Sequence, residues 1–306
     1  MNAPVDFKAI EGMFQREYRQ IEVRFDPEEA VAWTYMKPSG APCFSFGMLE
    51  ELRAHEGTIE ANGGRLLYEG ELRQIRYIVI ASKIESIFSL GGNLAWIVPL
   101  IKSHDRDTLM RYAKLCIDNI YSRICNYHSP MTTISLVQGE ALGGGFETAL
   151  ASNVIIAERR SRMGLPEILF NLFPGMGAYS LLGRRVGIKR AEEMMFSGRI
   201  YTAAELHEMG VVDVLAEDGL GEAAVDDYIC RNERRRNAMQ AMFSCRQHLN
   251  PISYDELLNI TNIWVDAALR LEDRDLKLMS RLGRSQLKRF QAESRVQTMQ
   301  EQVAYA

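Results

Sequence analysis

Two glutamates and a run of glycines form the part of the sequence best suited to chemistry. Glu147 follows the triple glycine 143–145, and Glu167 follows a proline in the otherwise apolar stretch 164–169. A carboxyl group held in apolar surroundings has a raised pKa, which brings it into the range useful for proton transfer. Glycines, which lack a Cβ, let a ligand approach the main-chain amides closely. Two such carboxyl groups beside open amides predict acid/base catalysis next to an oxyanion hole.

The elements around the glycines predict how these groups are positioned. Residues 133–137 are apolar and β-branched, and residues 146–151 are helix formers, so their order indicates a strand, a tight turn and a helix N-terminus. The first amides of a helix lack intrahelical partners and lie at the positive end of its dipole, so the turn suits negative charge. Residues 77–81, the glycine pair 91–92 and the helical run 94–101 repeat this order.

Residues 136–177 resemble the crotonase (enoyl-CoA hydratase/isomerase) superfamily. The shared features are the GEALGGGFE turn, the PEI segment and the PGMG loop, at residues 139–147, 166–168 and 174–177. Within the superfamily the chain is most similar to bacterial diffusible signal factor synthases of the RpfF type, over nearly its whole length. That narrower resemblance rests on four segments, residues 88–94, 164–167, 172–180 and 263–266.

The resemblance implies an α/β fold of the ClpP/crotonase type, a spiral of ββα units with a C-terminal helical region. Strands that alternate with helices around one continuous core independently favour the α/β class. We expect a crotonase-like core over residues 1–220. Residues 221–306 are expected to form a helical region that covers the acyl site and contributes to oligomerisation, as a homotrimer or a dimer of trimers.

The resemblance also assigns roles to particular residues. It implies that the oxyanion-hole amides belong to Gly92 and Gly144, whereas a glycine pair on its own more often marks an ordinary turn. Glu147 and Glu167 then share the proton transfers, with no fixed role for either. Taken singly, Glu147 is also typical of a first-turn carboxylate, and Glu167 of a loop acid paired with an arginine such as Arg162.

Several apolar residues predict either an acyl tunnel or an ordinary part of the core. These residues are Leu172, Phe173, Met176 and Trp264. The chain departs from the family pattern at Asn93 and Asn153, which stand where relatives commonly carry aspartate. Asparagine keeps the hydrogen-bonding capacity and removes the charge, so we expect both to affect loop anchoring and not proton transfer.

The narrower resemblance implies a diffusible signal factor synthase. Such an enzyme dehydrates 3-hydroxyacyl-[acyl-carrier protein] to the cis-2-enoyl form and hydrolyses the thioester, releasing a cis-2-unsaturated fatty acid for quorum sensing. The implied partners are acyl carrier protein and a regulatory sensor protein, and no cofactor is implied. The alternatives are an enoyl-CoA hydratase/isomerase of fatty-acid breakdown and a non-catalytic crotonase scaffold that binds a regulator. The pair of glutamates argues against the scaffold.

Composition argues against several other classes. The formal net charge of −4 gives no reason to expect nucleic acid or an anionic membrane as a partner. No apolar run is long enough to span a bilayer and the first residues lack a secretory pattern, so we expect a cytoplasmic protein. The five cysteines and five histidines are scattered without metal-ligand or redox spacing, which favours reduced, buried thiols and no metal. No glycine-rich stretch fits a nucleotide-binding loop.

The remaining pattern predicts the elements that complete the fold. A turn predicts a hairpin of strands 22–25 and 30–36. Residues 107–128 predict an amphipathic crossover helix, with Ser122 on the face expected toward solvent or a neighbouring subunit. The basic run 234–236 is interpreted as a solvated helix face or, alternatively, as a contact for acyl carrier protein. We further expect loops at 57–70 and 83–89 and strands at 153–157 and 211–215. Helices are expected at 44–56, 179–186, 189–196 and 202–209, and the last of them begins with a capping box.

Overall fold

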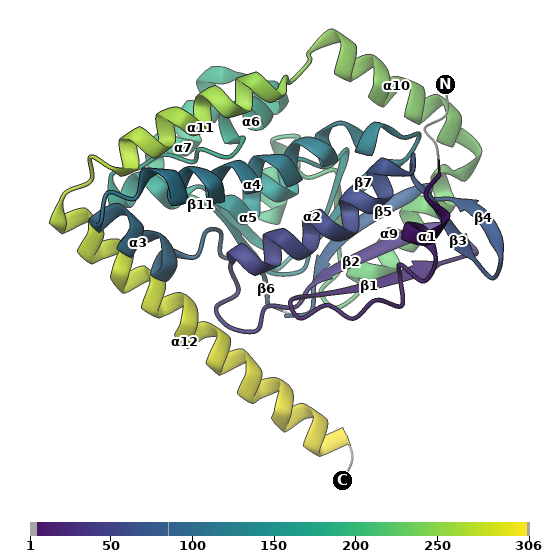
Figure 1. Ribbon diagram of the computed structural model, residues 1–306, viewed down its shortest axis with the longest axis horizontal. Coiled ribbons are helices and arrows are strands. Elements are labelled where there is room, and N and C mark those ends of the chain that lie inside the picture. The colour runs from purple at the N-terminus through teal and green to yellow at the C-terminus, as the bar shows by residue number, and fades with distance from the viewer. Residues whose placement is uncertain (1–4, 85, 305–306) are drawn as a thin grey trace.

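A six-stranded sheet runs through the centre of the computed structural model, which describes residues 5–84 and 86–304, with side chains up to residue 291. Its strand order is β1-β2-β5-β7-β9-β12 (Figure 1). β1 pairs antiparallel with β2, as predicted for the N-terminal hairpin, and the other neighbouring strands are parallel. The strands are β1 Ile21–Asp26, β2 Val31–Met36, β5 Tyr77–Ser82, β7 Thr132–Val137, β9 Val154–Glu158 and β12 Val214–Ala216.

A second, smaller sheet begins a few residues beyond the carboxyl ends of the long strands. Its order is β11-β10-β8-β6, with strands β6 Ile87–Ser89, β8 Glu140–Leu142, β10 Arg162–Gly164 and β11 Ile200–Thr202. Strands β6, β8 and β10 follow β5, β7 and β9 in turn, and each of the three is followed by helical structure. This repeat of long strand, short strand and helix confirms the predicted α/β spiral of ββα units.

The two faces of the large sheet carry different helices. Val79 and Ala81 of β5 pack in one cluster with Val225 of α9, whereas Ile80 packs in another with residues of α2 and α4. Alternation of this kind is expected of a strand buried on both faces. The helices of the core are α1 Phe7–Ile10, α2 Phe46–Ala61, α3 Leu94–Lys102, α4 Arg106–Ile124, α5 Gly144–Leu150, α6 Ala178–Val186, α7 Ile188–Ser197 and α8 Ala203–Glu208.

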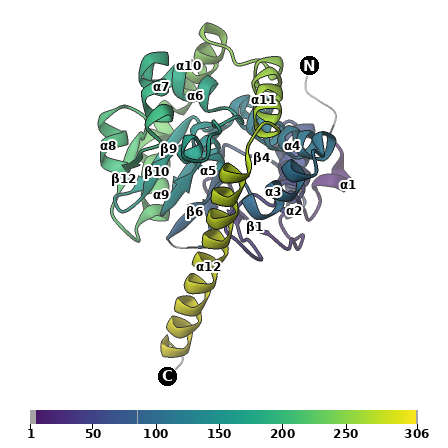
Figure 2. The same cartoon turned by 90° about the vertical axis from the view of Figure 1, so that its left-hand side faces the viewer.

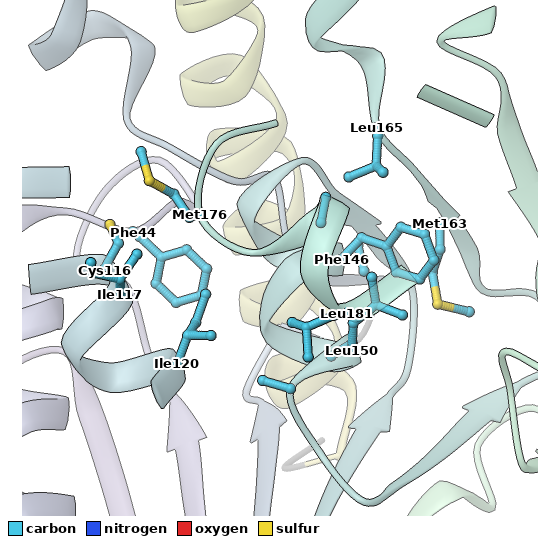
Figure 3. Close-up of a cluster of buried hydrophobic side chains, with 14 of the residues drawn as sticks. Phe44, Cys116, Ile117, Ile120, Phe146, Leu150, Met163, Leu165, Met176 and Leu181 are labelled. Carbon is cyan, nitrogen blue, oxygen red and sulfur yellow. The ribbon is translucent and has the colours of Figure 1, made fainter. Parts of the chain in front are cut away.

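The largest apolar cluster joins the crossover helix α4 to α5. Figure 3 shows Ile117 and Ile120 of α4 together with Phe146 and Leu150 of α5, all of them buried in this cluster. Full burial of such side chains is worth roughly 1.5–3 kcal/mol each. The cluster therefore fixes α5, the helix that begins at the triple glycine, against the rest of the core.

Helices follow β12 in the remainder of the described chain. They are α9 Gly221–Asn232, α10 Arg236–Leu249, α11 Tyr254–Ala268 and α12 Asp273–Ala304, and the predicted break at Pro251 lies between α10 and α11. α11 packs on α4 and α12 packs on α3, while the far half of α12 runs out beyond the body of the molecule (Figure 2). Among the helices of the described residues, none has the length and apolarity needed to cross a bilayer.

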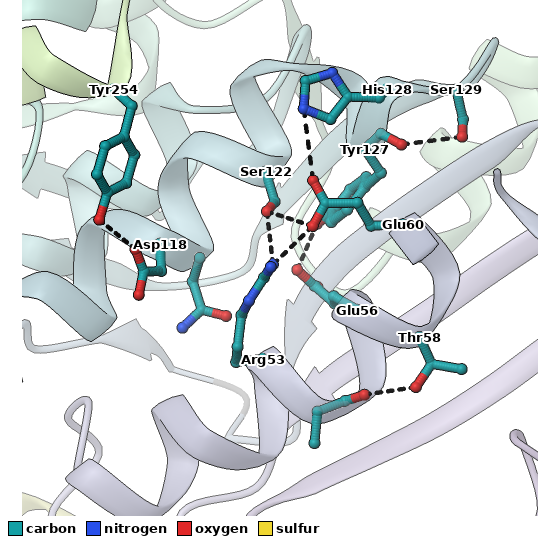
Figure 4. Close-up of polar contacts among 12 residues, drawn as sticks. Arg53, Glu56, Thr58, Glu60, Asp118, Ser122, Tyr127, His128, Ser129 and Tyr254 are labelled. Carbon is teal, nitrogen blue, oxygen red and sulfur yellow. Dashed lines mark hydrogen bonds and ion pairs between the residues drawn. The ribbon is translucent and has the colours of Figure 1, made fainter. Parts of the chain in front are cut away.

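A buried polar cluster ties α2 to α4. Arg123 donates to Glu56 at 2.8 Å, both side chains are almost fully buried, and the Tyr127 hydroxyl donates to the other oxygen of Glu56. Figure 4 shows Glu56 beside a second group in which Ser122 contacts Arg53 and Glu60. The prediction that Ser122 faces solvent or a neighbouring subunit is wrong, because its side chain is buried and its hydroxyl bonds to the partly exposed Arg53 and Glu60.

Two segments that we expected to be loops contain strands. Residues 57–61 continue α2, and the antiparallel hairpin of β3 Arg65–Tyr68 and β4 Glu71–Gln74 follows. Its turn holds Glu69 and Gly70 at positive φ, and β4 is largely exposed, so the hairpin lacks the apolar alternation by which a strand is detected. β6 lies within the other expected loop and is too short to show any periodicity.

Smaller differences concern the ends of elements and the thiols. The crossover helix ends at Ile124, because residues 126–128 turn through positive φ in the short 3₁₀ segment Asn126–His128. The last strand begins at Val214 and not at residue 211. The cysteines are free as expected, but the prediction that they are buried holds for Cys43 and Cys116 and is wrong for Cys230 and Cys245, which are exposed.

Candidate active site

The triple glycine makes room for chemistry at the start of α5. Gly143 has φ +53° and ψ −123°, a conformation open almost only to glycine. A Cβ at this position would lie 2.3 Å from the Oε1 atom of Glu167, and a Cβ on Gly145 would lie 2.3 Å from the carbonyl oxygen of Ser89. The glycines are therefore required both by the backbone turn and by the groups that crowd against it.

Gly92 and Gly144, the predicted oxyanion-hole residues, lie against each other across two loops. A Cβ on Gly144 would be 3.8 Å from the Gly92 nitrogen. Phe44 donates its amide to the Gly91 carbonyl at 2.8 Å, and since C=O and N–H point to opposite sides of a trans peptide, this bond turns the Gly92 N–H away from Phe44. No acceptor for either glycine amide is found among the described residues, which leaves both free to donate to a ligand.

Glu147 is held by two main-chain donors. Its side chain is buried, and its Oε1 atom accepts hydrogen bonds from the amides of Met176 and Ala178, both at 2.9 Å. Burial raises the pKa of Glu147 to about 7, although the two amides favour the charged form and oppose that rise. The second carboxyl oxygen stays available for proton transfer.

Glu167 lies in the 3₁₀ segment Pro166–Phe170, and no donor satisfies it in the same way. Its Oε2 atom is buried and has no hydrogen-bond partner in the described part of the chain. Burial first, and the nearby charge of Glu147 second, raise the pKa of Glu167 to about 8. Arg162, the alternative partner, is exposed on β10 and makes no described contact with this carboxyl group. Because the two carboxyl groups interact, their raised pKa values belong to the pair and assign the proton to neither residue alone.

Both glutamates and both glycines line one apolar pocket. Of the four residues predicted for the acyl group, Leu172, Met176 and Trp264 lie in the pocket lining, whereas Phe173 lies outside it and packs against the core. Residues of α2 and α4 that the sequence indicated only as core also form the wall, namely Leu49, Leu52, Cys116 and Ile120. The pocket thus extends from the two carboxyl groups to the residues of α2 and α4.

The last helix contributes two residues to the site that sequence reasoning did not identify. Met279 of α12 lines the pocket, and the Nε2 atom of Gln286 donates to the carbonyls of Leu90 and Gly92 at 3.0 and 3.2 Å. These bonds hold the loop that presents the Gly92 amide. Neither residue belongs to a motif, so only the spatial contact identifies them.

The two asparagines that depart from the family pattern act on local backbone. Asn93 caps α3 by accepting from the Trp96 amide at 3.3 Å, and Asn153 accepts from the Thr133 amide at 2.9 Å. Both therefore anchor loops, as predicted. Among the described residues no cluster of histidine, cysteine, aspartate and glutamate could hold a metal ion.

Known proteins share the sequence and the fold. The enoyl-CoA hydratase/isomerase family model matches residues 67–250. The chain is 33% identical over 153 residues to mitochondrial methylglutaconyl-CoA hydratase of Mus musculus, covering 50% of this chain and 46% of that one. It is 38% identical over 118 residues to cyclohexa-1,5-dienecarbonyl-CoA hydratase of Thauera aromatica, covering 39% and 45%. The chain thus spans about half the length of these curated relatives.

Solved structures extend the likeness of fold to most of the chain. Enoyl-CoA hydratase from Bacillus anthracis superposes with a TM-score of 0.65 at 22% identity, covering 84% of this chain and 93% of that one. DspI of Pseudomonas aeruginosa superposes with a TM-score of 0.61 at 20% identity, covering 82% and 92%. At such identities the likeness concerns the fold alone. The family model, however, spans more than half of the sequence and includes both glycine turns and both glutamates, and the chain belongs to the enoyl-CoA hydratase/isomerase (crotonase) family.

Proposed function

We propose that the protein catalyses the reversible addition of water to a 2-enoyl thioester, which gives a 3-hydroxyacyl thioester. One observation carries the proposal: two buried carboxyl groups with raised pKa values lie beside a pair of free amides in an apolar pocket. Curated relatives named as hydratases of CoA thioesters support the same reaction class.

The glycine amides would hold the thioester oxygen. Hydration and dehydration both pass through an enolate-like state in which negative charge builds on this oxygen. The Gly92 and Gly144 amides are already oriented and unpaired, so they stabilise that charge without reorganisation; one such donor is typically worth about 10²–10³ in rate.

Each glutamate would carry out one of the two proton transfers, and its role would depend on which of the two carboxyl groups is protonated. In hydration, the Glu147 carboxylate takes a proton from water while the Glu167 carboxylic acid gives one to C2. In dehydration, the proton must first move to Glu147, which then protonates the departing hydroxyl while ionised Glu167 removes the C2 proton. The pKa values of about 7 and 8 lie close together, so both arrangements are accessible near neutral pH.

A spectrophotometric hydration assay tests this function. Purified protein should hydrate trans-2-enoyl-CoA, and Glu147→Gln and Glu167→Gln should each lower kcat by about 10²–10⁴, the range of general acid/base catalysis. Glu208→Gln, which changes an exposed glutamate outside the pocket, is the matched control and should retain full activity. Retention of activity by either pocket variant would disprove the assigned chemistry.

A diffusible signal factor synthase is the second candidate, and a specific observation favours it. The four segments that carry this resemblance come from three separate parts of the sequence, yet each contributes to the same pocket. Gly92, Glu167, Met176 and Trp264, one residue from each segment, all line it. Support for the synthase therefore comes from residues of the pocket wall, of which Gly92 and Glu167 serve the hydratase equally.

The synthase reaction requires one step beyond dehydration. Water would add to the thioester carbonyl, the two glycine amides would hold the oxyanion, and the C–S bond would then break. The thiolate leaves with a proton, and the products are a free 2-enoic acid and the thiol of the carrier. A carboxylate next to the oxyanion hole is suited to remove the proton from the attacking water.

The two candidates differ in their products. A 3-hydroxydodecanoyl group should be offered both on acyl carrier protein and on CoA, with the products identified by mass spectrometry. Free cis-2-enoic acid from the carrier-protein substrate would establish the synthase. Reversible dehydration of the CoA thioester to the trans-2-enoyl form, without hydrolysis, would establish the ordinary hydratase and exclude the synthase.

A further inference from the structure

A row of basic side chains follows the exposed face of α12. Within residues 276–291 the sequence has five lysines or arginines and no acidic residue. Four of them, Lys277, Arg281, Arg284 and Lys288, are separated by four, three and four residues, the spacing that places side chains on one face of a helix. All four are exposed. We call these four residues the α12 basic stripe.

The stripe is not neutralised within the described part of the chain. None of its four side chains makes an ion pair there, whereas other exposed arginines do: Arg159 pairs with Glu217 at 2.8 Å and Arg231 with Asp227 at 3.2 Å. The whole chain carries a formal charge of −4, so this concentration of positive charge runs against the general balance. Such a patch creates a local field that attracts an acidic partner.

The position of the stripe connects it to the active site. The opposite face of α12 packs on α3, where a Cβ added to Gly283 would lie 3.0 Å from the Ala95 nitrogen. On the flank between these faces, Ser285 and Arg289 line a surface groove that also includes Gly92 and Glu167. Since a helix advances 100° per residue, Ser285 lies about 40° around the helix from Arg281. The groove to the catalytic groups therefore opens beside the stripe.

We propose that the α12 basic stripe docks an acidic carrier protein, whose flexible prosthetic arm delivers the acyl thioester through this groove. The proposal rests on the proposed thioester chemistry and specifies that the acyl group reaches the site on a carrier protein. The shape of the surface favours a protein over the nucleotide of CoA. The stripe extends about 16 Å along a convex helix face, whereas small cofactors are bound in concave sites.

The basic run 234–236 does not meet the same requirements. It follows Glu233, which pairs with Arg76 at 3.1 Å, directly before the first residue of β5. The glycine loops follow the other end of that strand, about 20 Å away at 3.3 Å per residue. A carrier bound at this run would face the wrong end of the sheet, so these arginines provide a matched control.

Charge reversal on the stripe tests the proposal. The variant Lys277→Glu/Arg281→Glu/Arg284→Glu should lower kcat/KM for the acyl-carrier-protein substrate by about 10–10³, mainly through KM, because the attraction of charged partners has this range. It should leave kcat/KM unchanged for the same acyl group on N-acetylcysteamine, a small thioester without a protein carrier. The control Arg234→Glu/Arg235→Glu should change neither value. Added salt should weaken turnover of the carrier substrate by the wild type and by this control, and not by the charge-reversed variant.

Each other result has a defined meaning. Equal losses on both thioesters would show a structural defect and overturn docking at the stripe, as would full activity of the variant on the carrier substrate. Turnover of the small thioester but not of the carrier substrate by the wild type would refute the docking proposal and leave the proposed function intact. If neither thioester reacts, the proposed function fails. Calorimetric titration with acyl carrier protein still tests docking at the stripe, because the wild type should bind the carrier and the charge-reversed variant should not.

Discussion

Substitution of Gly143 by alanine offers a sharp test of how the site is built. The new Cβ would lie 2.3 Å from the Oε1 atom of Glu167, and since such contacts are essentially never closer than 3.0 Å, the carboxyl group must retreat by 0.7 Å or more. Misplacement of a reacting group by about 1 Å costs about 10²-fold in rate. We therefore expect Gly143→Ala to lower kcat for hydration about 100-fold, with a smaller change in KM.

Backbone strain must be separated from displacement of the carboxyl group. Gly143 has a positive φ, so alanine also costs about 1–3 kcal/mol of stability. Gly70→Ala is the control, because Gly70 also has a positive φ but a Cβ there would meet nothing within 4 Å. Both variants should unfold at lower urea concentration than the wild type, and only Gly143→Ala should lose activity under conditions where it is fully folded.

A double substitution decides whether the loss acts through Glu167. In a Glu167→Gln background, Gly143→Ala should lower the residual rate by less than about threefold, because effects that act through one group are not additive. If Gly143→Ala instead removes a further 100-fold in that background, or leaves kcat unchanged in the wild type, the contact between Gly143 and Glu167 does not determine the geometry of the site.

Three further predictions concern protons, amides and the buried ion pair. The folded pKa values of Glu147 and Glu167, about 7 and 8, exceed the ordinary 4.5. The stability that these groups contribute is therefore present below about pH 4.5 and is lost as the pH rises through 8. Urea unfolding measured across this pH range should show the loss, and Glu167→Gln should make it smaller. Gly144→Pro removes one oxyanion donor and distorts the turn at Gly143, so kcat should fall by at least about 10²–10³-fold in the hydration assay. Arg123→Ala should lower the free energy of unfolding in urea by about 3–5 kcal/mol, because it leaves the buried Glu56 carboxylate without its ion pair. Arg159→Ala, at an exposed ion pair, should lower it by less than about 1 kcal/mol. Equal losses in the two variants would contradict this account.

Local signals were sufficient to predict the frame of the site. The buried strands β5 and β7 show continuous apolar runs, the glycine turns follow them directly, and Thr202 with Glu205 forms the predicted capping box. Each of these features depends on neighbouring residues only. The carboxyl groups of Glu147 and Glu167 could be paired by resemblance, and the structure brings them into one pocket.

The rest depends on contacts between distant segments, which periodicity does not report. Leu49 and Cys116 look like ordinary core residues, and only the packing of α2 on α4 turns them into pocket wall. Phe173 has the same apolar character as Met176, yet the loop turns it away from the pocket. The difference between the two carboxyl groups also required the structure, because the Met176 and Ala178 amides donate to Glu147, whereas the Oε2 atom of Glu167 has no partner among the described residues.

The bonds from Gln286 to the first glycine loop have a consequence for the order of folding. Gln286 and Leu90 are separated by 196 residues, so this contact closes a very long stretch of chain. Contacts of such high sequence separation form late, because their entropic cost must be met before they stabilise anything. On dilution from denaturant, helical signal should return first and turnover should lag behind it, until the last helix settles on the loop.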